Sequence, residues 1–524
     1  WVEGEAYNTL EVALKSSISA TTFPELLVSA YQENKLNSVL KEVDGYYCAA
    51  LYDPKKHKIY LFSDRYGTRL LYYYQKDDDF AWASEVKSLL ALPFVDRTID
   101  EASLPCFMDL GYLLGEHTWH KHIKLIQPAS YIEYDLGKKS FIQDYYWKWS
   151  EVGPLAISFD SASEQLGELM LAAVKKRFNP NEKIGIALSG GLDSRMLFAA
   201  VNHLFPEYQG YAFTFGIPGC LDVEIAKQVT AKTKWKHQLF YFTNGNWFRP
   251  RIEKIFDTDG MMNMLHMHGS EFLSQINENI DINLNGFAGD AICGPSFLTN
   301  ANINSRISKT LAAQFYGKYS ELTGFSEDFY DIHKMLPNLM SNRVRRFTVM
   351  GSVNALTMVE QRKPFLDNDL FNFILSIPDE YRLNNRIYSR ALLKMFPDFF
   401  IDIPWQKSGK PISYQSNFLE DFWHFGKRVL RKLGLYSFPN YSYNDYPNWL
   451  KEKDLANTLM AMLKRDTSLY QSFTDADFQH SLVTPHMEGK ADNSEKILRA
   501  VTFEQYLKWC SIMLPDDETK NEKK

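Results

Sequence analysis

A regular alternation of strand-like and helix-like segments between residues 184 and 287 limits the folds open to this chain most strongly. The strand-like segments are residues 184–188, 211–215, 237–242 and 282–287. The helix-like segments between them are residues 195–205, 222–233 and 269–280. Alternating strands and helices of this kind predict a parallel, doubly wound sheet with helices on both faces. Because ligands of such sheets lie beyond the carboxyl ends of the strands, we expect a binding site there.

The residues before this alternation have a different pattern. From residue 44 to residue 92, short β-rich runs alternate with turn signals such as Asp53-Pro54. A strand-like sequence pattern continues through YIEYDLGKKSFIQDYYW. This pattern is typical of antiparallel hairpins. A helix is then predicted over residues 161–178, behind a cap at Asp160 or Ser161.

The length of 524 residues exceeds what one hydrophobic core usually serves. We therefore expect an antiparallel, β-rich domain over residues 1–150 and an α/β domain over residues 151–515. The spacing of apolar residues after about residue 300 predicts a mainly helical extension of the second domain. The charged residues 516–524 are predicted to form a disordered tail.

Composition excludes some classes of partner. With 45% hydrophobic and 23% charged residues and a net charge of −6, the chain has no basic footprint for nucleic acid. No apolar run reaches the roughly eighteen residues of a membrane helix, and residues 1–8 do not resemble a signal peptide. We expect a cytoplasmic protein with neither a nucleic-acid nor a membrane partner, and the first residue, Trp1, indicates a processed or truncated form.

Five scattered cysteines form no CxxC pair, which predicts reduced and mostly buried thiols. They are Cys48, Cys106, Cys220, Cys293 and Cys510.

Residues 189–194 read SGGLDS and directly follow the first strand of the alternating region. Glycines at 190 and 191 allow backbone N–H groups to approach an anion closely, while Ser189 and Ser194 add hydroxyl donors. Asp193 can hold a magnesium ion. The lysine of a Walker A loop is absent. A strand followed by SGGxDS and a helix therefore predicts a phosphate site, and it is typical of the PP-loop pyrophosphatases.

Further segments resemble the asparagine synthetase family over nearly the whole chain. GEAYN, VDGYYCAALYD, SDRYGTRLLYYY and ASEVKSLLAL are similar to its glutaminase domain, which is of the Ntn amidotransferase type. FGIPGCLDVEIAKQV, LNGFAGDAICG, RKPFLDNDL, SIPDEYR and WQKSGK are similar to its synthetase domain. The family includes relatives that form lactams and lasso peptides.

The resemblance implies an ATP-dependent, Mg²⁺-dependent ligase. Such an enzyme converts a carboxylate to an acyl-adenylate with release of pyrophosphate, and an amine then displaces AMP. Asp193 and Asp290 match the magnesium-binding aspartates, and Lys407 matches the lysine that stabilises the adenylation transition state. Asp222 matches an acidic position near the pyrophosphate, and Arg362 is expected to brace the site through Asp367 or through the sheet. The residues expected to contact the nucleotide are Ser189, Gly190, Gly191, Asp193, Ser194 and Gly286.

Two departures affect the synthetase motif SGEGxDE. Phe287 stands in place of the first acid, and Ala291 stands in place of the second. A general base must therefore come from elsewhere, and the candidates are His266, His268 and Glu271.

The glutaminase half departs further from the family. Its nucleophile is an N-terminal cysteine located before GEAYN, which this sequence does not contain. The oxyanion-hole asparagine of NGEIYN is Glu3 here, although Gly4 remains, and the aspartate that binds the glutamine amino group falls at Phe23. We interpret this domain as degenerate or N-terminally truncated.

The favoured interpretation is an AMP-forming amide ligase that transfers a small-molecule or peptide carboxylate to ammonia or an amine. The alternatives are a genuine glutamine-hydrolysing asparagine synthetase, a lactam or lasso-peptide cyclase or sugar-acid amidating enzyme, and a non-catalytic scaffold. Retention of Asp193, Asp290 and Lys407 argues against the scaffold. A homodimer and a complex with a pathway partner both stay open.

Overall fold

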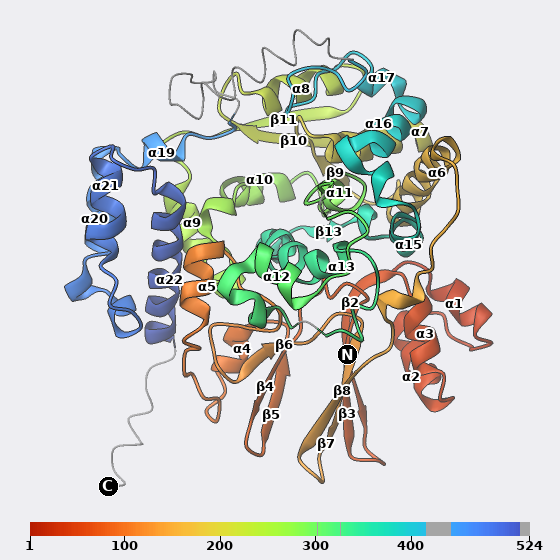
Figure 1. The fold of residues 1–524 in the computed structure, drawn as a ribbon, viewed down its shortest axis with the longest axis horizontal. Helices are drawn as coiled ribbons and strands as arrows, with labels where there is room; N and C mark the ends of the chain where they lie inside the picture. The colour runs from red at the N-terminus through yellow and green to blue at the C-terminus, as the bar shows by residue number, and fades with distance from the viewer. Residues whose placement is uncertain (301, 325, 415–441, 514–524) are drawn as a thin grey trace.

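A computed structural model describes residues 1–300, 302–324, 326–414 and 442–513 of the chain. Antiparallel sheets form its first part, as predicted (Figure 1). One sheet has the strand order β1-β2-β3-β7-β8 (Val2–Ala6, Gly45–Asp53, Lys58–Ser63, Ser130–Asp135, Ser140–Tyr145). The other has the order β5-β4-β6 (Asp79–Ala83, Tyr72–Lys76, Ile123–Leu125). The accompanying helices are α1 (Thr9–Lys15), α2 (Phe23–Gln32), α3 (Leu36–Glu42), α4 (Val86–Leu90) and α5 (Ser103–Leu110).

A parallel sheet of order β11-β10-β9-β12-β13 forms the second part. Its strands are β9 (Ile184–Ala187), β10 (Tyr211–Gly216), β11 (Lys236–Tyr241), β12 (Ile282–Leu284) and β13 (Glu360–Arg362). The strand order reverses beside β9, so this sheet has the switch point at which doubly wound folds bind ligands. The four predicted strands are confirmed, and β13 is an additional strand.

Helices cover one face of the parallel sheet. α7 (Leu192–Leu204) packs there against β9 and α8 (Leu221–Thr230) packs against β10, while α6 (Phe159–Arg177) packs against α7. The cap of α6 differs from the prediction, because the side chain of Ser158 accepts from the backbone N–H of Ser161.

The opposite face is covered more thinly. The predicted helix over residues 269–280 is replaced by a 3₁₀ turn, Ser270–Phe272, and the short helix α10 (Leu273–Asn277). Gly269 precedes them with a φ of 98°, a left-handed conformation that a continuous helix does not contain.

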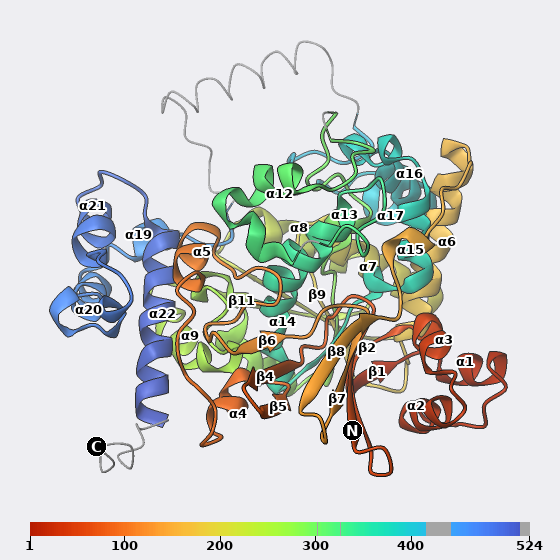
Figure 2. The ribbon, with the colours of Figure 1, turned by 60° about the horizontal axis from the view of Figure 1, so that its bottom comes forward.

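The remaining chain is mainly helical, as predicted. Its helices are α9 (Phe248–Lys254), α11 (Gly289–Ile292), α12 (Lys309–Tyr316), α13 (Leu336–Leu339), α14 (Met350–Val353), α15 (Asn368–Ser376), α16 (Arg386–Met395), α17 (Pro397–Phe400), α19 (Tyr446–Trp449), α20 (Lys453–Met462), α21 (Thr484–Met487) and α22 (Ser494–Met513). A π-helix, Met340–Val349, joins α13 to α14. In Figures 1 and 2, α22 runs beside α5, and their apolar residues share one cluster.

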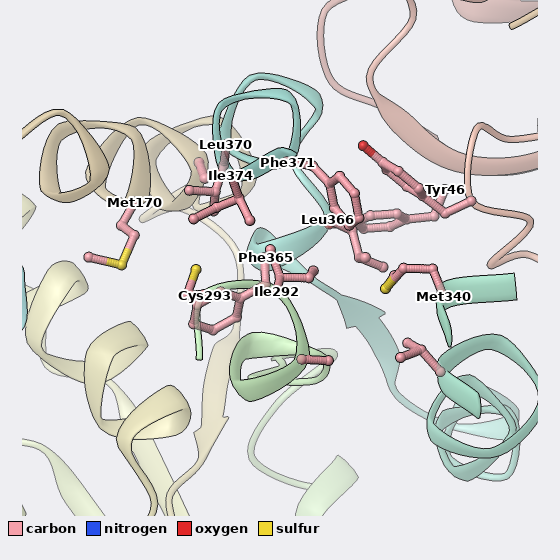
Figure 3. Packing of buried hydrophobic residues seen from close by; sticks show 14 of the residues in the cluster. Tyr46, Met170, Ile292, Cys293, Met340, Phe365, Leu366, Leu370, Phe371 and Ile374 are labelled. Atoms are coloured by element: carbon pink, nitrogen blue, oxygen red, sulfur yellow. The ribbon is translucent and has the colours of Figure 1, made fainter. Parts of the chain in front are cut away.

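The largest hydrophobic cluster joins the antiparallel and parallel parts. Figure 3 shows Tyr46 of β2 lying beside Phe371 and Leu366, which belong to the segment after β13. Cys293 is buried in the same cluster. All five cysteines are free, four of them buried, as the sequence predicted.

Buried arginines add polar contacts across the same boundary. Arg177 at the end of α6 pairs with Asp44 at 2.6 Å and with Asp367 at 2.8 Å. The π-helix contributes Arg345, whose Nε donates to the carbonyl of Gly67 at 2.8 Å. The two parts are therefore held together by apolar packing and by charge.

No helix in the described ranges is long and apolar enough to cross a membrane. The predicted tail, residues 516–524, lies outside the described residues.

Candidate active site

The SGGLDS loop joins β9 to α7 at the switch point of the parallel sheet. Two serines hold it in a tight turn, because the backbone N–H of Ser189 donates to Ser194 Oγ at 3.0 Å and the two hydroxyls lie 3.0 Å apart. The N–H of Gly191 donates to Ser189 Oγ at 3.1 Å. The loop thereby delivers its polar groups to the N-terminus of α7, where the helix dipole favours an anion.

The glycines of this region are required by close packing. A Cβ at residue 190 would lie 3.0 Å from the Cβ of Gln406, and one at residue 286 would lie 3.0 Å from the backbone nitrogen of Ser194. Three segments that are distant in sequence therefore meet around the loop.

Asp222, near the start of α8, connects two of these segments. One carboxylate oxygen accepts from the N–H of Gly190 at 2.8 Å, and the other accepts from Gln406 Nε2 at 2.6 Å. Burial raises the pKa of Asp222, while the bond from Gly190 lowers it. The structure thus gives this acid a defined position, which fixes the loop relative to the WQKSGK segment.

Asp193, Asp290 and Lys407 come together beside the loop. The backbone N–H of Asp290 donates to Asp193 Oδ2 at 2.9 Å, and Lys407 Nζ lies 3.1 Å from Asp290 Oδ2. Asp290 also accepts from the hydroxyl of Ser296, and Asp193 accepts from Tyr388 Oη at 3.0 Å. These contacts collect two carboxylates and one ammonium from three separate segments.

Burial, followed by the negative charge of Asp290, raises the pKa of Asp193 to about 7. A cation between the two carboxylates would relieve this repulsion. Oxygen ligands suit Mg²⁺, which usually takes one or two protein carboxylates and completes its coordination with phosphate oxygens and water. Asp193 and Asp290 supply the two carboxylates of such a site.

A cavity of about 390 Å³ opens next to the loop. Five of the predicted nucleotide-contacting residues line it: Ser189, Gly191, Asp193, Ser194 and Gly286. Gly190, Asp290 and Lys407 are outside the lining; Gly190 is buried, whereas the side chain of Lys407 is 59% exposed. Lys407 therefore lies beside the cavity, in contact with Asp290.

Only one of the three candidate general bases reaches the cavity. His268 lines it, and Tyr443 Oη lies 3.5 Å from its Nδ1. The surrounding protein, and then the charge of Arg251, lower the pKa of His268, which favours the neutral imidazole. His266 instead packs against Phe347, and Glu271 is bound by Arg251 at 2.5 Å.

Of the two predicted braces for Arg362, the one through Asp367 is wrong, and the contacts of Arg362 lie in the sheet. Arg362 lies in β13, and its guanidinium pairs with Glu5 of β1 at 2.7 Å and with Glu182 at 2.5 Å. Asp367 pairs instead with Arg177 and caps α15. Arg362 therefore ties the two sheets together and does not contact the loop.

The positions that depart from the glutaminase motif have structural roles. Phe23 is buried at the start of α2, where its ring packs edge-on against Tyr47 with centroids 4.5 Å apart. It offers no acceptor for an amino group. Glu3 is 38% exposed, and Arg69 lies 4.0 Å from its carboxylate. Gly4 has a φ of 106°, and a Cβ there would lie 2.0 Å from the carbonyl oxygen of Tyr46.

The chain joins an antiparallel β-rich part to a parallel sheet that carries a phosphate-type loop. This is the architecture of enzymes that combine an amidotransferase domain with a synthetase domain. Comparison with known families agrees with this class. A model described as a glutamine amidotransferase domain matches residues 1–147, and one described as asparagine synthase matches residues 165–402. Together the two matches support the asparagine synthetase family for this chain.

Curated relatives are similar over about half to three quarters of this chain. A putative asparagine synthetase [glutamine-hydrolyzing] 1 of Methanocaldococcus jannaschii is 26% identical over 415 residues, covering 75% of this chain and 67% of the relative. Asparagine synthetase [glutamine-hydrolyzing] 2 of Bacillus subtilis is 24% identical over 448 residues, covering 75% and 59%. A second M. jannaschii relative, putative asparagine synthetase [glutamine-hydrolyzing] 2, is 27% identical over 257 residues, covering 48% and 49%. The chain thus spans between half and two thirds of the length of these relatives.

Proposed function

We propose that this chain is an ATP-dependent ligase that forms carbon–nitrogen bonds. It adenylates a carboxylate with release of pyrophosphate, and ammonia or an amine then takes the acyl group and releases AMP. The observation that carries the proposal is the meeting of Asp193, Asp290 and Lys407 beside the N-terminus of α7. A retained scaffold has no need to bring these three charges together.

Each group has a distinct task in this chemistry. The hydroxyls of Ser189 and Ser194 and the N-terminus of α7 bind phosphate oxygens. Asp193 and Asp290 would hold Mg²⁺, which would offset the charge of the phosphates. The ammonium of Lys407 offsets the charge that develops on the α-phosphorus oxygens during attack, so it stabilises the transition state more than the ground state.

The position of Lys407 is also consistent with motion during turnover. Its ammonium is bound to Asp290 while the side chain stays largely exposed. Asp290 is also one of the two carboxylates that would hold Mg²⁺, and the exposed side chain of Lys407 has room to reach a phosphate oxygen.

We propose further that the antiparallel part does not hydrolyse glutamine. The apolar packing of Phe23 and the charge of Glu3 support this, because neither side chain can replace the amide donor or the carboxylate anchor that the motif provides. The amine is then free ammonia or a substrate amine. This arrangement favours a tailoring ligase over a genuine glutamine-hydrolysing asparagine synthetase.

Substitution of Lys407 tests the proposal. A panel of carboxylates with hydroxylamine as the amine first identifies a substrate by pyrophosphate release. On that substrate, Lys407→Ala should lower single-turnover AMP formation by about two to three orders of magnitude, with little change in ATP affinity. Lys227→Ala, which removes an exposed lysine of α8, is the matched control and should leave the rate unchanged. A loss of less than about threefold in Lys407→Ala would exclude Lys407 from the reaction.

A further inference from the structure

The floor of the cavity is one face of the parallel sheet. The strand register places Gln361 of β13 opposite Asn283 of β12, and Asn283 opposite Gly185 of β9. In the next row, Ala187 of β9 lies opposite Phe213 of β10. Side chains two residues apart on a strand share a face, so Gln361, Asn283, Ala187 and Phe213 form a continuous surface. All four line the cavity.

The walls around this floor are largely apolar. Leu273 and Ile276 of α10 are 6% and 3% exposed, and Val359 beside β13 is 1% exposed. All three line the cavity and belong to one cluster with Phe213. Phe215 and Phe287 add two further rings to the lining, so an aromatic side chain stands where the family motif has its first acid.

The polar part of the floor is a set of neutral amides. Gln361 Oε1 accepts from Asn283 Nδ2 at 2.9 Å and from Asn285 Nδ2 at 2.8 Å. Gln361 Nε2 donates to the carbonyl of Val359 at 3.0 Å. Each amide nitrogen carries two hydrogens, and these bonds use one of them. The remaining N–H groups can donate to a carbonyl or amide oxygen of a ligand without adding charge.

Charged groups are confined to the phosphate end. Among the described residues that line the cavity, the ionisable side chains are Asp193, Asp222, His268 and Tyr443, and none is a lysine or an arginine. Arg251 lies near His268 but is fully buried and paired with Glu271. A second carboxylate on a substrate would therefore enter apolar surroundings without a counter-charge, which is strongly unfavourable.

We propose that the acyl substrate is a carboxylic acid whose remaining part is uncharged, with an apolar or aromatic group and an amide or carbonyl oxygen. An N-acylated amino acid or the carboxylate of an apolar peptide has this chemistry, and a dicarboxylic amino acid does not. This inference rests on the proposed adenylation. It concerns the part of the cavity away from the loop residues that are expected to contact the nucleotide, and the described lining there contains neither a lysine nor an arginine.

Non-hydrolysable acyl-adenylate analogues test the charge directly. The probes are 5′-O-sulfamoyladenosines that carry N-acetylphenylalanyl, N-acetylasparaginyl or N-acetylaspartyl groups, and the last two differ in essentially one charge. Calorimetry with the full chain and Mg²⁺ should show both neutral analogues binding at least about tenfold more tightly than the aspartyl analogue. Equal or tighter binding of the aspartyl analogue overturns the inference and leaves the ligase proposal standing. If neither AMP nor any of the analogues binds, the ligase proposal itself fails.

Truncation of the wall provides a second measurement. Leu273→Ala should weaken the N-acetylphenylalanyl analogue by about tenfold, because the ligand loses apolar contact. Leu10→Ala, which changes a 65% exposed leucine of α1, should leave its affinity unchanged. Unchanged affinity in Leu273→Ala would show that the apolar wall does not contact the ligand and would overturn the inference.

Discussion

Replacement of Arg177 by methionine should destabilise the whole chain, because this arginine is the most heavily engaged charge at the boundary between the two sheets. Its guanidinium pairs with Asp44 and Asp367, receives the faces of Tyr7 and Tyr46 at 4.6 and 5.4 Å, and is fully buried. Methionine keeps most of the volume but leaves the two carboxylates without their main counter-charge.

The magnitude follows from these contacts. Removing one partner of a buried ion pair costs about 3–5 kcal/mol. Lys176 still lies 3.1 Å from Asp367 and 3.8 Å from Asp44, so it compensates in part. We therefore expect a loss of about 3 kcal/mol, at the lower end of that range. Burial already raises the pKa of Asp44 to about 6 while Arg177 lowers it. Without Arg177 the carboxylates can protonate more readily, so the loss should be smaller at pH 5 than at pH 8.

Urea unfolding followed by tryptophan fluorescence at both pH values measures this loss. The control is Arg390→Met, which removes a 59% exposed arginine whose nearest carboxylate, Asp160, is 3.5 Å away. That change should cost less than about 1 kcal/mol. A cost below about 1 kcal/mol for Arg177→Met at pH 8 would refute the reasoning.

Three further predictions concern pH, the site and the antiparallel part. Burial lowers the pKa of His120 from its usual 6.5 to about 4, so the neutral imidazole contributes fully to folding stability above pH 6.5 and this contribution is lost as the pH falls toward 4. The free energy of unfolding should therefore fall by about 2 kcal/mol between pH 7.5 and pH 5. His120→Gln should flatten this pH dependence, whereas His480→Gln, which changes an exposed histidine, should not. Gly289→Ala should lower pyrophosphate release at least about tenfold with an unchanged melting temperature, because its Cβ would lie 2.4 Å from Asp193 Cγ. Gly245→Ala, whose Cβ meets no atom within 4 Å, should leave the rate of pyrophosphate release unchanged. Glutamate release from glutamine should remain at the background rate with and without ATP, and release above background would show that the glutaminase motif tolerates its substitutions.

The parallel sheet could be predicted because its four recognised strands are apolar runs bounded by helical spacing. β13 was not predicted, because it is three residues long and its sequence, Glu-Gln-Arg, has no strand-like pattern. Its position depends on pairing with β12, which is a tertiary contact. Residues 269–280 were predicted as one helix, but Gly269 at their start is left-handed and the α-helix covers only Leu273–Asn277.

The sequence motifs identified the main residues of the candidate site, but they did not identify the residues that hold those side chains in place. Asp193, Asp290 and Lys407 were identified by their segments, and their roles stay predictions. Tyr388 and Gln406, which bind Asp193 and Asp222, were missed. Tyr388 lies on a helix 195 residues further along the chain than Asp193, and the sequence around Tyr388 does not indicate its hydrogen bond to Asp193.

The π-helix gives a structural reason for the antiparallel part to be retained during evolution. Arg345 and Arg346 project from it into the antiparallel part, where they donate to the carbonyls of Gly67, Ile126, Leu113 and His117. Loss of the antiparallel part would remove the four backbone acceptors of these two guanidinium groups. Selection on amide formation alone would then retain residues 1–150, even where glutamine is never cleaved.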